Sequence, residues 1–79
     1  MVRSFTVKPP MASQIGYIGE WLDEMLVNLQ NTGWKILSVR PSSYALYDYN
    51  QHKYVSAPMY IIVAKGGDYD ALEEKMGVD

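Results

Sequence analysis

The chain has no cysteine, a single histidine and a single phenylalanine. The lack of cysteine and histidine limits the cross-links, metal sites and nucleophiles that the chain can form. Without cysteine there is no disulfide, no thiolate metal site and no cysteine nucleophile. With His52 as the only imidazole, a metal centre built from several histidines is excluded. We therefore expect neither a metal nor a cofactor. Small domains commonly gain stability from a disulfide, a metal or a partner subunit. Self-association is therefore the remaining way for this chain to gain stability.

Long apolar runs are also lacking. No segment approaches the roughly 20 apolar residues of a membrane helix, and the N-terminus lacks the basic start and apolar run of a secretory signal. We therefore expect a cytoplasmic protein without a membrane partner. A length of 79 residues predicts one domain over residues 1–79.

Charge is unevenly distributed along the chain, although the net charge is only −2. Residues 13–32 and 68–79 are acidic, whereas the rest of the chain carries Asp48 as its only acidic residue. The basic side chains of that remainder are Arg3, Lys8, Lys35, Arg40, Lys53 and Lys65. The expected helices are therefore acidic and the expected strands basic, which favours attraction between the two kinds of element.

The N-terminal half shows first strand and then helix periodicity. Residues 2–8 alternate apolar and polar side chains, which predicts a strand that ends at a Pro-Pro pair. Apolar residues at helical spacing predict a helix over 13–31, with Ser13 as its N-cap. Two early glycines weaken its first turns, so a start nearer Tyr17 is also open. Gly33 is the predicted stop, with Trp34 packing back on the last turn.

The C-terminal half predicts two more strands and a short helix. A strand over 34–39 is expected to be interrupted by a bend or bulge at 41–43 and to resume over 44–49. A third strand covers 53–65, where Pro58 predicts an edge open to solvent or a bulge. The apolar run 59–64 predicts that its middle is covered on both faces. Asp68 is the predicted cap of a last helix that Gly77 closes.

These elements define an α+β fold of order β-α-β-β-α. We expect a three-stranded, mainly antiparallel sheet with the main helix packed on one face and a short C-terminal helix. One helix covers one face of a sheet, so the other face requires a partner or water. Trp34 is expected to anchor the fold at the junction of helix and strand.

A resemblance to a known family lies in two segments. They are residues 21–39, with Leu29, Gly33, Trp34 and Leu37, and the returning strand 60–65. They resemble a family of short bacterial and phage proteins known as the four-one-seven-seven domain of unknown function. In that family a leucine-rich helix ends in Gly-Trp, a strand follows, and a hairpin returns as an apolar strand. The resemblance covers roughly residues 3–65 and implies the order β-α-β-β and a bacterial or phage origin. The family has no assigned reaction, so it implies no functional residue.

Catalytic patterns are scarce. A general base needs a partner and an orienting group, and His52 next to a predicted turn offers neither. The paired carboxylates lie in the acidic helices, where they are typical of solvated faces. No phosphate-binding glycine pattern is present. We expect a protein that is not an enzyme and has no catalytic residue.

Tyrosine is the abundant feature: there are seven, most of them close together in the predicted hairpin. A two-residue turn at 50–51 pairs Tyr47 with Tyr54 and Tyr49 with His52, whereas a four-residue turn pairs Tyr49 with Tyr54. Either register gives the hairpin an aromatic face. Cross-strand tyrosine pairs stabilise sheets, but tyrosine is also enriched at protein interfaces.

Two functions fit this pattern. The first is a non-catalytic interaction module that acts as a homo-oligomer and also suits a host or cellular protein as a partner. The second is binding of a small anionic nucleotide by rings and cations of the hairpin. A nucleic-acid polymer is disfavoured by the negative net charge. The candidate ligand or interface residues are Tyr47, Tyr49, Tyr54, His52, Arg40 and Lys53.

Overall fold

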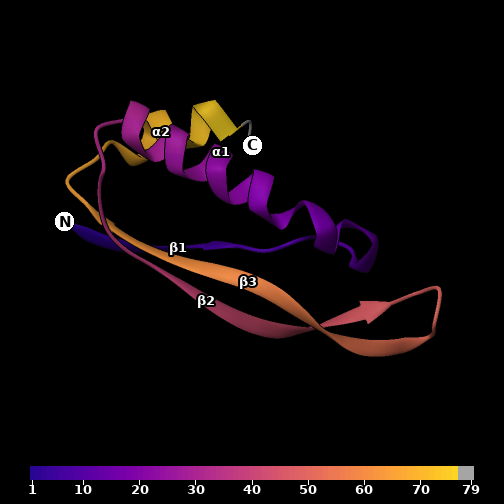
Figure 1. Cartoon of the computed structure of the whole chain (residues 1–79). Helices are drawn as coiled ribbons and strands as arrows, with labels where there is room; N and C mark the ends of the chain where they lie inside the picture. Colours follow the sequence, from indigo (N-terminus) through magenta and orange to yellow (C-terminus); the bar gives the residue numbers. More distant parts are fainter. Residues whose placement is uncertain (77–79) are drawn as a thin grey trace.

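The computed structural model describes residues 1–76 and confirms the α+β fold and the order β-α-β-β-α (Figure 1). A 3₁₀ helix precedes the main helix. None of the helices in residues 1–76 is long and apolar enough to cross a membrane. The elements are β1 (Val2–Val7), η1 (Ala12–Tyr17), α1 (Ile18–Asn31), β2 (Lys35–Asp48), β3 (Lys53–Lys65) and α2 (Tyr69–Met76).

The three strands form one antiparallel sheet in the order β1-β3-β2. β1 pairs with β3 from Val2↔Lys65 to Val7↔Tyr60, and β2 pairs with β3 along its whole length. Helices α1 and α2 lie on the same side of the sheet, and α1 runs obliquely across it (Figure 1). β3 is therefore the central strand, and β1 and β2 each have an outer edge without a strand beside it.

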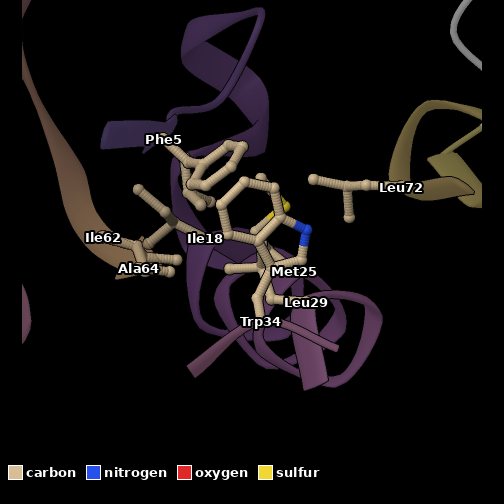
Figure 2. Close-up of a cluster of buried hydrophobic side chains, with 9 residues drawn as sticks. Phe5, Ile18, Met25, Leu29, Trp34, Ile62, Ala64 and Leu72 are labelled. Carbon is tan, nitrogen blue, oxygen red and sulfur yellow. The ribbon is translucent and has the colours of Figure 1, made fainter. Parts of the chain in front are cut away.

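The core lies between α1 and the sheet, and α2 closes one end (Figure 2). Alternation along the strands decides which side chains enter it. Ile62 and Ala64 of β3 are fully buried on the helix side, whereas Ile61 and Val63 on the opposite side are half-buried. The expectation that the middle of the run 59–64 is covered on both faces is therefore wrong. The helices cover one face of the sheet, as the sequence predicts. The core residues are Phe5, Val7, Ile18, Met25, Leu29, Trp34, Ile62, Ala64 and Leu72.

The main helix begins late. Residues 12–17 form the tighter 3₁₀ turns of η1, and regular α geometry starts at Ile18, as the two early glycines favoured. Ser13 is not the N-cap, because it lies inside η1 and the position before α1 is Tyr17, whose side chain makes no capping hydrogen bond. A serine two residues into the 3₁₀ segment is placed too early to reach the unpaired amides of α1.

The helix ends where the sequence predicts. Gly33 takes a left-handed conformation with φ of 85°. Its amide donates to the Gln30 carbonyl at 3.2 Å, and the Trp34 amide donates to the Leu29 carbonyl at 3.0 Å. This pair of bonds is the Schellman arrangement, in which the residue after the glycine packs against the last turn. Trp34 is thereby directed into the core, where its ring meets Phe5 edge-to-face at 5.1 Å.

β2 is one continuous strand, and its irregularity lies elsewhere than expected. The register shifts between Ile36 and Ser38, so Leu37 is the extra residue of a bulge. Residues 41–43 stay paired with β3, and Pro41 lies opposite Tyr60. The predicted break at 41–43 is therefore wrong. A proline is tolerated on an edge strand when its missing N–H would have faced outward, and β2 is an edge strand.

β3 has the predicted bounds. The hairpin takes the register that the two-residue turn at 50–51 predicts. Tyr47 pairs with Tyr54 and Asp48 with Lys53, and the ladder stops there. Pro58 lies two residues beyond the last pair that β3 makes with β1. One edge of β3 is therefore without a strand at that point, which is what Pro58 predicts.

The last helix is capped as expected. The Asp68 carboxylate accepts a hydrogen bond from the Ala71 amide at 3.1 Å, and the Asp68 amide donates to the Thr32 carbonyl at 3.1 Å. The second bond ties the start of α2 to the end of α1. Leu72 of α2 is buried in the core. The predicted stop at Gly77 lies outside the described residues.

Candidate functional site: the hairpin arm

The far half of the β2–β3 hairpin, residues 43–56, extends beyond the layer of α1 and α2, and we call it the hairpin arm (Figure 1). The molecule measures 41 × 24 × 18 Å. Its radius of gyration is 13.7 Å, larger than the roughly 11.6 Å expected of a compact domain of this length. A two-stranded ribbon is at best marginally stable on its own, and none of the residues of the core cluster lies in the arm.

Three tyrosine rings form a connected cluster on the arm. Tyr47 lies between the other two, with its ring centroid 4.8 Å from that of Tyr49 and 5.2 Å from that of Tyr54. Both contacts are edge-to-face, the arrangement that ring quadrupoles favour. The outer rings stay open: Tyr49 is 79% exposed and Tyr54 is 71% exposed. The cluster is thus held in place by its own contacts while most of its area faces outward.

The tip of the arm is set by Asp48. Its carboxylate accepts hydrogen bonds from the Asn50 amide at 2.9 Å and the Gln51 amide at 3.3 Å. His52 completes the turn in a left-handed conformation with φ of 54°, and its side chain is exposed. Lys53 lies directly opposite Asp48. The predicted residues His52 and Lys53 therefore shape the turn beside the tyrosine cluster.

Tyr44 fixes the root of the arm. Its hydroxyl donates to the Pro9 carbonyl, and the Lys8 ammonium lies 5.1 Å from the centre of its ring. Burial raises the pKa of the Tyr44 hydroxyl above its ordinary value of 10.0. The protonated form that donates to Pro9 is thus the favoured one. This contact joins two residues 35 positions apart, so it holds the loop after β1 against the hairpin.

A hollow of about 380 Å³ lies where that loop passes the arm. One wall is formed by Pro10, Met11, Ala12 and Ser13, and the other by the consecutive residues 46–50. Consecutive residues point alternately to the two faces of a strand, and no residue of β3 lines the hollow. The hollow therefore lies between the loop and the last residues of β2.

Arg40 is not brought to the cluster. It lies opposite Ile61, well before the arm begins. Tyr47 lies seven residues further along the strand, which is about 23 Å in an extended chain. The hollow also carries Asp48 and no basic side chain. The structure thus brings together the rings of Tyr47, Tyr49 and Tyr54. It places His52 in the adjacent turn and Lys53 opposite Asp48, and it leaves Arg40 apart, so the arrangement gives little support to an anionic ligand.

Sequence reasoning missed the loop wall of the hollow and the role of Tyr44. The signal available was the Pro-Pro pair, which turns the chain sharply after β1. No local sequence pattern predicts which segment the chain contacts after this turn. Within residues 1–76 the structure gathers no group of histidine, cysteine, aspartate or glutamate side chains of the size needed to hold a metal ion.

Comparisons of the chain with protein-family models, curated proteins and solved structures give no match. The resemblance of residues 3–65 to the four-one-seven-seven family stays a prediction.

Proposed function

We propose that this protein is a non-catalytic interaction module that acts as a homo-oligomer through the hairpin arm. The observation that carries the proposal is the preformed cluster of Tyr47, Tyr49 and Tyr54 on a ribbon that the helices leave uncovered. Tyrosine contributes a large contact area and a hydroxyl at a low entropic cost when it becomes buried in an interface. Rings already held by one another lose little further freedom on binding.

The thin core supports the same proposal. A domain of 79 residues retains only about 4–12 kcal/mol of stability. Burial of the arm against a second copy adds apolar contact without disulfide or metal. Assembly is thus the means by which a chain of this size stabilises a long, exposed hairpin.

A double variant tests the proposal. Tyr47→Ala combined with Tyr54→Ala removes the cross-strand pair but leaves the core untouched, so the circular dichroism spectrum should persist while the oligomer mass falls. Tyr17→Ala is the matched control, because Tyr17 is an exposed tyrosine outside the arm. If the double variant unfolds, or if it stays folded and fully assembled, the tyrosines are packing residues of the hairpin and the proposal is wrong.

The wild-type protein and the double tyrosine variant also test nucleotide binding, the second candidate function. A thermal-shift screen against mono-, di- and cyclic nucleotides should leave the melting temperature of the wild-type protein unchanged. Stabilisation by a nucleotide that the double tyrosine variant loses would make the arm a ligand site instead.

A further inference from the structure

We infer that two copies of this chain join through the outer edges of their β2 strands, which pair antiparallel about a two-fold axis at Ala45. This inference rests on the proposed function and specifies the surface that carries out the assembly. It starts from the unpaired backbone groups of β2. A long strand at the edge of a sheet presents a row of free N–H and C=O groups that template pairing with another chain.

Only the first half of the β2 edge is protected against pairing with another strand. Natural edge strands are blunted by lysines, bulges and prolines, and the first half of β2 carries all of these in Lys35, the bulge at Leu37 and Pro41. After Pro41, residues 42–48 contain no basic residue, no proline and no bulge. Two of them are Tyr44 and Tyr47, aromatic residues that suit strands. The second half of the edge is thus competent for pairing.

The other outer edge of the sheet offers no comparable surface. β1 is only six residues long. Arg3 lies within it, and Lys8, Pro9 and Pro10 follow it. Short length, charge and proline are the devices that prevent edge pairing. Assembly through backbone pairing is therefore directed to β2.

The prolines show which groups of β2 point outward. Alternate residues of an antiparallel strand direct their N–H and C=O groups to one neighbour and then the other. Pro41 lacks an N–H, and Pro58, which lies opposite Ser43, lacks one too. Residues 41 and 43 therefore belong to the set that does not bond to β3. By alternation the groups of Ser43, Ala45 and Tyr47 are directed to the free edge.

The bounds of the free segment fix the register. Pro41 cannot donate to a new neighbour, and β2 ends at Asp48. The longest uninterrupted stretch is 42–48, whose midpoint is Ala45. Antiparallel self-pairing about Ala45 places Ser43 opposite Tyr47 of the second copy and Tyr44 opposite Leu46. The outward groups of Ser43, Ala45 and Tyr47 then meet one another in hydrogen-bonded pairs.

Charge complementarity supports the same register. In this pairing Asp48 lies opposite Ser42 of the second copy and diagonal to its Arg40. Diagonal neighbours on one face are about 7–8 Å apart, within reach of long side chains. Symmetry makes the contact twice. No like charges are opposed, because the segment carries only Asp48.

There is also space next to the end of β2. The hollow of about 380 Å³ adjoins residues 46–50 of β2 and faces the loop at 10–13. In the proposed register the chain of the second copy approaching these residues is its segment at 42–44. The side chains there are two serines and Tyr44, which bring no charge next to Asp48.

Cysteine cross-linking tests the register, and the native chain has no cysteine to confuse the result. Ala45→Cys places two sulfur-bearing residues opposite each other, with Cα atoms about 5.5 Å apart in a hydrogen-bonded pair. A disulfide requires about 4.4–6.8 Å. Ser56→Cys is the matched control, because Ser56 is exposed and lies opposite Ala45 on the inner strand β3. Its copies would be about 15 Å apart, which is too far for a disulfide.

Under mild oxidation Ala45→Cys should form a covalent dimer at least about tenfold faster than Ser56→Cys. In parallel, Ala45→Pro removes the central outward N–H and should convert the assembly to monomer while leaving the β2–β3 ladder intact. Equal cross-linking rates would overturn the inference, whether or not Ala45→Pro folds. If the wild-type protein is oligomeric in that case, the proposed function stands and the surface is a different one. A wild-type monomer would overturn both.

Discussion

Gly67 lies against the face of the Trp34 ring so closely that a Cβ built on it would come within 2.1 Å of the Trp34 Cγ atom. The indole is buried, with 5% of its surface exposed. The segment between β3 and α2 thus crosses directly over the residue that ends α1. Only a residue without a side chain fits there, which makes Gly67 part of the core packing around Trp34 rather than a simple turn residue.

We predict that Gly67→Ala destabilises the protein by about 1–3 kcal/mol, the usual cost of forcing extra volume into a packed core. Urea unfolding followed by circular dichroism measures this loss. Gly19→Ala is the control. Gly19 lies in α1, and nothing is within 4 Å of a Cβ built there. It should raise stability by about 0.5–1 kcal/mol. Two glycine substitutions with equal effects would contradict the close packing on Trp34.

Trp34→Ala should unfold most of the protein at 25 °C. Truncation of a buried aromatic side chain costs about 3–5 kcal/mol, and a domain of this size has about 4–12 kcal/mol to lose. The indole Nε1–H is buried without an acceptor among the described residues, so Trp34→Phe, which deletes that group, should cost less. Thermal melts of both variants measure the difference. A cooperative melt of Trp34→Ala close to that of the wild type would show that Trp34 does not anchor the fold.

Alkaline pH should loosen the root of the arm. Burial raises the pKa of the Tyr44 hydroxyl in the folded state, so the folded protein holds this proton more tightly than the unfolded chain. The resulting stability is fully present below the unfolded pKa of about 10 and is lost as pH rises through the folded pKa. Tyr44→Phe also lacks the hydrogen bond to the Pro9 carbonyl. It should be less stable than the wild type at pH 8, and the gap should narrow above pH 10. A constant gap would show that Tyr44 does not titrate differently on unfolding.

The features that the sequence predicted well are local ones. Gly33 followed by Trp34 ends the helix through bonds that span a few residues, and Asp68 caps α2 through its own carboxylate. The aromatic pairing of Tyr47 with Tyr54 follows from the turn alone once its register is chosen. Such signals are complete within a short window of sequence.

The features that it missed depend on segments far apart in the chain. The bulge falls at Leu37 rather than near Pro41 because the register is fixed by β3, and an edge strand accepts a proline without a break. The cover of β3 was also misjudged, since a continuous apolar run gives no alternation to show that Ile62 is buried while Ile61 is only half-buried. The hollow at the arm requires the contact of Tyr44 with Pro9, which no local pattern encodes.

We propose that this chain functions as an assembly of identical copies joined through the hairpin arm. Sedimentation equilibrium of the wild-type protein over a range of micromolar concentrations measures the mass of that assembly. We expect a mass that rises with concentration to twice the 9.0 kDa of one chain, and that stays at the single-chain value in the double variant Tyr47→Ala with Tyr54→Ala. A wild-type mass of 9.0 kDa at every concentration would show that the chain does not assemble.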